Sequence, residues 1–192
     1  MAFSIPEDLA PELYPLAWLV GRWHGFGMVG YHGVPERSVV SEMVVDHDGG
    51  PYLRATHTLW LVDEDLSGSV DHERSGAEGY AALVKDVQWS AETSYWRPVG
   101  SERTGDGVRV ELEVVVADPA GSLSLYLGAA EGPRITLATD AVVTSPTAAQ
   151  VSAGSRMYGL VASDLLWVQD LAAFGQDLGP YSSGRHSRVE EA

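Results

Sequence analysis

The stretch that decides the fold comes directly after Val20 and reads Gly21-Arg22-Trp23-His24-Gly25-Phe26-Gly27. Glycine recurs here at a period of two, which is the side-chain repeat of a strand. Glycine weakens a strand, so three of them on one face indicate that a helix, a neighbouring strand or a flat ligand lies close against the backbone. Trp23 shares that face and is expected to plug one end of whatever the strand encloses.

Most of the remaining chain has the pattern of short strands joined by tight turns. A short helical turn is expected at 11–19, with Pro15 awkward inside it. Turns rich in glycine and proline separate the later segments. The segments that read as strands are 39–45, 52–62, 108–117, 122–128, 134–139, 141–144, 155–161 and 165–174. Eight to ten short strands with few helices predict an all-β closed barrel or a sandwich.

Two segments interrupt this succession of strands. Residues 100–107 have no apolar periodicity and are predicted to form a hairpin tip. Residues 67–90 do not fit the meander, and we interpret them as an inserted surface excursion between two strands. A lid over a pocket is the alternative, because long loops within compact domains are often functional.

The composition predicts one acidic domain over residues 1–192. Lys and Arg number 12 against 27 Asp and Glu, which gives a net charge of −15. A surface of this charge repels phosphate backbones and anionic lipid, so neither nucleic acid nor a membrane surface is an expected partner. The chain has no long apolar run and no basic leader, which predicts a cytoplasmic location. The absence of cysteine excludes disulfides, thiolate metal sites and cysteine nucleophiles.

Beyond these local patterns, the glycine motif resembles that of the nitrobindin family, small β-barrels related in shape to fatty-acid-binding proteins and lipocalins. The resemblance covers most of the chain and continues through 28–31, 42–53, 92–97, 155–160 and 164–188. It implies a single antiparallel barrel of about ten strands with a short N-terminal helical cap and a haem pocket. Some members bind ferric haem b through a histidine near the C-terminus and isomerise peroxynitrite to nitrate.

The resemblance places Tyr181 where the family has its iron-ligating histidine. That histidine follows a Gly-Gln-x-Leu signature, and the run here is Gly175-Gln176-Asp177-Leu178-Gly179-Pro180-Tyr181. Arg185 and Arg188 stay in register downstream, so misalignment does not readily explain the substitution. Gly33 likewise stands where the family has a threonine at the haem edge. Both departures argue against ordinary histidine-ligated haem.

Three interpretations of Tyr181 stay open. Tyrosinate can ligate ferric haem, but it generally needs a positive neighbour to lower its pKa from about 10, and Arg185 is the only nearby candidate in sequence. The iron ligand could instead be His186, which lies an odd number of residues further along and needs a bulge to reach the same face. In the third interpretation, Tyr181 fills space with its ring inside and its hydroxyl hydrogen-bonded.

Other polar residues have two interpretations each. His57 alternates with apolar neighbours, so it points inward either as a pocket residue or as a hydrogen-bonded core histidine. Arg97 and Arg156 lie on strands and by default face outward. Inside a barrel, either could pair with a buried glutamate such as Glu42 or Glu92, or with the carboxylate of a ligand.

These patterns favour a protein that binds a small molecule, because closed barrels of this size can hold one ligand. The preferred function is binding of a small hydrophobic or amphipathic ligand without ordinary histidine-ligated haem. The alternative is a ferric haem protein that binds nitric oxide or isomerises peroxynitrite, with Tyr181 or His186 on iron. Enzymatic activity and a homodimer stay open. Trp23, Tyr31 and Tyr181 are expected at the pocket mouth, and the predicted cofactor-binding residues are Gly21, Trp23, Gly25, Gly27, Tyr31, Gly33 and Tyr181.

Overall fold

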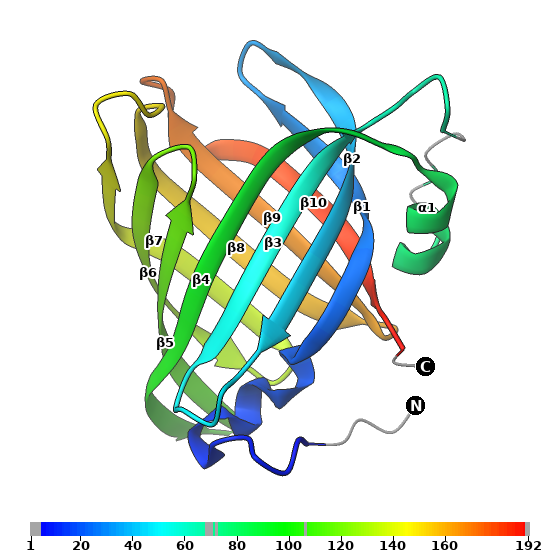
Figure 1. Cartoon of the computed structure of the whole chain (residues 1–192). Helices are drawn as coiled ribbons and strands as arrows, with labels where there is room; N and C mark the ends of the chain where they lie inside the picture. Colours follow the sequence, from blue (N-terminus) through cyan, green and yellow to red (C-terminus); the bar gives the residue numbers. More distant parts are fainter. Residues whose placement is uncertain (1–4, 68–70, 72, 106, 191–192) are drawn as a thin grey trace.

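The chain folds into a closed antiparallel barrel (Figure 1). The computed structural model describes residues 5–67, 71, 73–105 and 107–190. Neighbouring strands in the sequence pair with each other, and the last strand returns to the first to close the ring. The strands are β1 (Gly21–Tyr31), β2 (Val34–Asp46), β3 (Leu53–Val62), β4 (Lys85–Thr104), β5 (Gly107–Asp118), β6 (Ser122–Glu131), β7 (Arg134–Thr144), β8 (Val151–Val161), β9 (Asp164–Ala173) and β10 (Gly179–Arg188). The predicted all-β barrel of about ten strands is confirmed.

A short 3-10 helix, η1 (Pro11–Leu19), closes the end of the barrel where β1 begins. Leu13, Leu16 and Leu19 of this helix are fully buried in the barrel core. Trp23 on β1 donates a hydrogen bond of 2.9 Å from its indole Nε1 to the Leu19 carbonyl, which fastens the helix to the first strand. We call this the closed end. The open end is the opposite one, where β1 ends and β10 begins.

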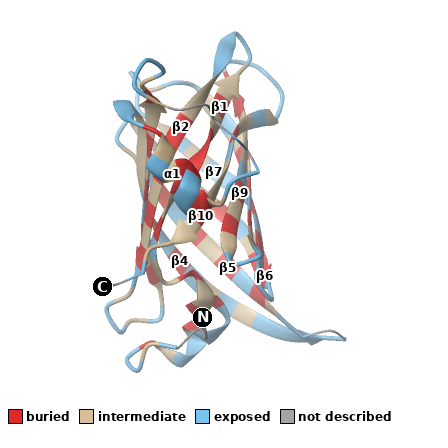
Figure 2. Ribbon diagram, turned by 90° about the vertical axis from the view of Figure 1, so that its right-hand side faces the viewer, coloured by how far each residue is buried: buried red, intermediate tan, exposed pale blue. Residues whose placement is uncertain are grey.

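Burial alternates along the strands (Figure 2), and the inward-facing side chains differ between the two halves of the barrel. In the closed half they are bulky and buried, as in Trp23, Met43, Leu53, Trp96, Ile135 and Leu165. In the open half, several inward positions hold smaller or polar side chains that remain only half-buried: Ser90, Ser124, Thr139 and Gln169. The interior is therefore tightly filled at the closed end and accessible towards the open end.

The helix α1 (Gly76–Ala82) lies against the outer wall of the barrel, beside β1 and β10 (Figure 1). A Cβ on Gly79 would lie 2.0 Å from the Phe26 ring, so the helix packs closely on β1. The Tyr80 ring stacks on His24, with 4.3 Å between the ring centroids. This part of the predicted insertion covers the wall and not the open end; residues 68–70 and 72 of the insertion lie outside those described.

Two strands differ in organisation from the sequence prediction. β4 starts at Lys85, inside the predicted insertion, and continues through most of the predicted hairpin tip to Thr104. β7 unites the two predicted strands 134–139 and 141–144. Its pairing with β6 slips at Asp140, which is a bulge and not a break. Within the part of the chain that the structure describes, no helix has the length and hydropathy to span a membrane.

Candidate functional site

Tyr181 lies at the open end on a bulge of β10. The pairing of β10 with β9 slips between Pro180 and Ser182, so Tyr181 is the extra residue, and a bulge of this kind re-aims a side chain. Its hydroxyl accepts a hydrogen bond of 2.8 Å from the indole Nε1 of Trp89. Trp89 belongs to β4, which is separated from β10 by β1, β2 and β3 on the shorter way round the barrel. The Trp89–Tyr181 hydrogen bond therefore bridges the open end.

Tyr31 stands beside Tyr181, with 6.2 Å between the two ring centroids in an edge-to-face arrangement. The Tyr31 hydroxyl accepts a hydrogen bond of 2.8 Å from the backbone N–H of Ala173 on β9, which holds the ring at the rim. Both tyrosines line a groove of about 440 Å³ built from β1, β2, β9 and β10, together with His32. Gly33 follows in the β1–β2 turn with a φ of +82°, a conformation that favours glycine.

Trp23 does not lie at this mouth. It is 2% exposed and sits at the closed end, so its predicted place in the pocket mouth is wrong. Gly21 starts β1 at the same closed end, next to the Arg188 guanidinium. The alternation of the motif does define one inward-facing side of β1. That side runs the length of the barrel, and the sequence alone does not indicate which end is open.

The two middle glycines of the motif make room for a strand. A Cβ on Gly25 would lie 1.8 Å from the Arg185 carbonyl oxygen, and a Cβ on Gly27 would lie 2.1 Å from the Ser183 carbonyl oxygen. Both oxygens belong to the backbone of β10. Of the three possibilities that the glycine pattern allowed, the structure has the neighbouring strand.

A chain of buried polar side chains crosses the interior below the open half. His186 is fully buried, and its Nε2 lies 2.6 Å from the hydroxyl of Ser41. The same hydroxyl lies 2.8 Å from Nε2 of His57. On its other side, the His57 ring has Nδ1 3.9 Å from the carboxylate of Glu92, and Glu92 binds Arg156 through both of its oxygens, with one contact at 2.7 Å. We call these five residues the polar cluster; β10, β2, β3, β4 and β8 supply one each.

The polar cluster carries one ion pair and two neutral imidazoles. Burial lowers the pKa of His57 to about 4, and it lowers the pKa of His186 well below its ordinary value. Burial alone would raise the pKa of Glu92, but the Arg156 guanidinium more than offsets this and the pKa lies below its usual value. Burial likewise opposes the charge on Arg156, while Glu92 holds its pKa well above the usual value. The charges of the polar cluster therefore sum to zero at neutral pH.

The sequence left two alternatives for the arginines on strands, an outward-facing position or an ion pair inside the barrel, and the structure contains one example of each. Arg156 pairs inside the barrel with Glu92, one of the two glutamates predicted as partners. Arg97 takes the outward position and pairs with Glu113 on the surface. Inward-facing His57 is hydrogen-bonded, as a core histidine would be.

Neither candidate iron ligand has the setting that axial ligation of haem requires. Arg185, the cation nearest to Tyr181 in sequence, lies outside the barrel and donates to the Arg74 carbonyl at 2.7 Å. Burial raises the pKa of Tyr181, although the Trp89 N–H acts in the opposite direction, so tyrosinate is disfavoured. The bulge at Tyr181 does turn His186 into the interior, but this ring is sealed in the core with its Nε2 held by Ser41. The residues therefore do not fit an ordinary haem site.

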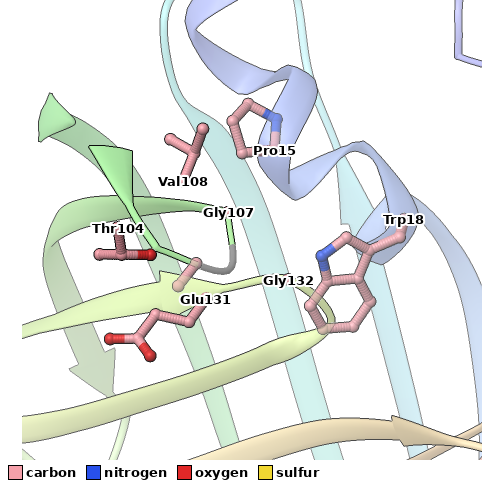
Figure 3. A pocket seen from close by; sticks show the side chains of 8 residues that line it. Pro15, Trp18, Thr104, Gly107, Val108, Glu131 and Gly132 are labelled. Atoms are coloured by element: carbon pink, nitrogen blue, oxygen red, sulfur yellow. The ribbon is translucent and has the colours of Figure 1, made fainter. Parts of the chain in front are cut away.

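A second groove, of about 560 Å³, lies at the closed end between η1 and the ends of β4, β5 and β6 (Figure 3). Trp18 and Pro15 of η1 form one side of it. Glu131 is the one ionisable side chain among its lining residues, and it already pairs with Arg109 at 2.9 Å. This groove offers no group for chemistry, so we place the candidate site at the open end.

A closed antiparallel barrel that is accessible at one end belongs to the class of barrels that hold a small ligand inside. The sequence model of the family described as "THAP4-like, heme-binding beta-barrel domain" matches residues 12–188. The chain therefore belongs to this family of barrels, the nitrobindin family, as the glycine motif predicted.

Relatives with known names support the same assignment. A protein named "Ferric nitrobindin-like protein" from Beutenbergia cavernae is 45% identical, over 98% of this chain and 100% of its own length. A protein named "Peroxynitrite isomerase" from Leifsonia xyli subsp. xyli is 36% identical, over 97% of this chain and 99% of its own. The crystal structure of Rv2717c from M. tuberculosis superposes with a TM-score of 0.71 at 26% identity, over 95% of this chain and 100% of that one.

Proposed function

We propose that this protein binds one small apolar or amphipathic molecule in the open half of its barrel, without a histidine ligand to haem iron. The observation that carries the proposal is the partial exposure of the inward-facing Ser90, Ser124, Thr139 and Gln169. These side chains belong to the open half of the barrel, and Gln169 is paired in register with Arg156 of the polar cluster. Their small or polar side chains leave room where the closed half is filled by tryptophan and leucine, and a concave site of this kind suits a ligand of modest size.

A ferric haem protein that binds nitric oxide or isomerises peroxynitrite is the second candidate. The description of the family as haem-binding and the names of several relatives favour it. The bulge at Tyr181 also favours it, because Tyr181 and His186 both reach the interior. The hydrogen bonds of these two side chains argue against it.

A hemin titration followed by absorption separates the two candidates. We expect the wild-type protein to give no sharp Soret band at micromolar hemin. A sharp band that is lost in Tyr181→Phe, and kept in the control Tyr95→Phe on the exposed outer wall, would instead establish Tyr181 as an iron ligand and overturn the preferred function. A sharp band that is kept in Tyr181→Phe would mean that another residue ligates the iron, and His186 would be the first residue to test.

The ligand site itself is tested with the uncharged fluorescent probe N-phenyl-1-naphthylamine. Ser90→Trp puts a large ring into the open half, so it should weaken probe binding at least about 10-fold by occupying the space. Thr93→Trp on the same strand points outward and serves as the matched control. Equal binding by both variants would place the probe outside the barrel.

A further inference from the structure

The Glu92–Arg156 ion pair lies where a ligand in the open half would end. Glu92 points inward, and its side chain keeps 17% exposure, more than the 7% of Arg156. The strand pairing puts Ser90 two residues closer to the open end than Glu92. The carboxylate is therefore the charged group of the polar cluster that a ligand entering past Ser90 meets first.

Among the described residues, this inner surface has no unpaired cation to offer an anionic ligand. Glu92 already neutralises Arg156 through two contacts, and the two imidazoles of the polar cluster are neutral. Nearer the rim, the carboxylate of Asp118 acts on Tyr181 and adds a negative charge. A carboxylate that entered the open half would meet two anions and a cation that is already paired, and a buried charge without a partner is strongly unfavourable.

Several buried polar atoms in the polar cluster, and in the Trp167 ring that packs against its two histidines, lack a partner among the described residues. Nε1 of Trp167, Nε of Arg156 and Nδ1 of His186 have no hydrogen-bond partner among the described residues. The indole edge of Trp167 next to Nε1 lies against Gly184, two residues closer to the open end than His186. Buried donors and acceptors usually find partners, and an oxygen supplied by a ligand or a water can provide them.

We infer that the ligand ends in an uncharged oxygen function, a hydroxyl or a carbonyl, next to the polar cluster, and that the Glu92–Arg156 pair selects against a carboxylate. The inference rests on the function proposed above and adds the chemical class of the ligand. A neutral oxygen can accept from the free N–H groups without bringing a charge into the barrel. The ion pair then acts as a filter for charge, because it leaves neither member free to bind an ionised ligand.

Three compounds with the same apolar chain test the inference: decanol, decanoate and decylamine, each used at pH 8 to displace N-phenyl-1-naphthylamine from the wild-type protein. We expect decanol to displace the probe at a concentration at least about 10-fold below that of decanoate, which corresponds to about 1.4 kcal/mol. The equal chain lengths remove the hydrophobic contribution from the comparison.

Two substitutions then change the net charge of the Glu92–Arg156 pair in opposite directions. Glu92→Gln leaves Arg156 as an unpaired cation, so decanoate should gain about 10-fold relative to decanol. Arg156→Gln leaves the Glu92 anion, so decylamine should gain instead. Either variant alone is a sufficient test if the other does not fold. Glu113→Gln breaks the matching ion pair with Arg97 on the outer wall and should leave the order of the three compounds unchanged.

The outcomes separate the inference from the proposed function. If the probe binds and decanoate displaces it as well as decanol does, the inference is wrong and the proposed function stands. The inference is also wrong if a folded charge variant keeps the wild-type order. If neither the probe nor any of the three compounds binds inside the barrel, the proposed function is wrong and the inference falls with it.

Discussion

His57 and His186 are neutral because they are buried, and this makes the stability of the protein depend on pH. The pKa of His57 falls from 6.5 to about 4 in the folded state, and the pKa of His186 falls well below 6.5. The unfolded chain therefore binds protons between pH 6.5 and 4 that the folded chain does not bind. The free energy of unfolding must decrease as the pH falls through this window, and stability is retained above it.

Urea unfolding at pH 7, 6 and 5 measures this dependence. Each histidine contributes a slope of up to about 1.4 kcal/mol per pH unit. His57→Gln keeps a hydrogen-bonding side chain and removes one titrating group, so it should make the slope shallower. His32→Gln, in the exposed β1–β2 turn, is the control and should keep the wild-type slope. A stability that is flat from pH 7 to 5 would contradict the neutral state assigned to both imidazoles.

Among the elements, β1 and β10 are packed closely together because glycine lets their backbones approach. Gly27→Val would push a side chain towards the Ser183 carbonyl, and backbone cannot move aside as a flexible side chain can. We expect a loss of about 1–3 kcal/mol in the free energy of unfolding by urea. Met28→Val changes the next, outward-facing residue and should be nearly neutral. Wild-type stability combined with lost probe binding would mean that Gly27 faces a ligand and not a strand.

The sequence predicts the elements well where they depend on local patterns. Period-two alternation and turn residues located most strands, and Pro15 correctly indicated a short, irregular helix at η1. Bulges have no such local signal, because they arise from how two strands pair. The bulges at Asp140 and Tyr181 were therefore missed, and with them the continuity of β7 and the way Tyr181 and His186 share the interior.

The same limit applies to the site. Ser41 and His186 are 145 residues apart in the chain, and the local sequence around neither residue indicates a hydrogen bond between them. Trp89, the partner of Tyr181, lies in the segment 67–90, which the sequence predicts to be an insertion. The Glu92–Arg156 pair was foreseeable because a barrel forces a buried charge to find a partner. Which residues meet across the interior follows from the strand register, which the sequence does not give.

At the scale of the whole molecule, we expect stability to depend on the closed end and the proposed ligand binding to depend on the open end. Leu16→Ala removes a fully buried side chain from η1 and should cost about 2–5 kcal/mol in the free energy of unfolding. Probe binding at 25 °C should stay within about 2-fold of wild type, because the open half is unchanged. Tyr14→Ala, on the exposed face of the same helix, is the control and should change stability little. A parallel loss of probe binding in a folded Leu16→Ala protein would show that the two ends are coupled.

Closure of the ring by β10 against β1 also determines when, during synthesis, the protein can complete its fold. The register runs from Trp23 opposite Arg188 to Val29 opposite Ser182. The first strand to leave the ribosome therefore cannot form these hydrogen bonds until the last strand has been synthesised. Until then β1 and β9 each present an unpaired edge, and such edges attract other chains. The nascent protein is thus most prone to aggregate just before β10 emerges, and the helix α1, which packs against both β1 and β10, can settle fully only after that strand is in place.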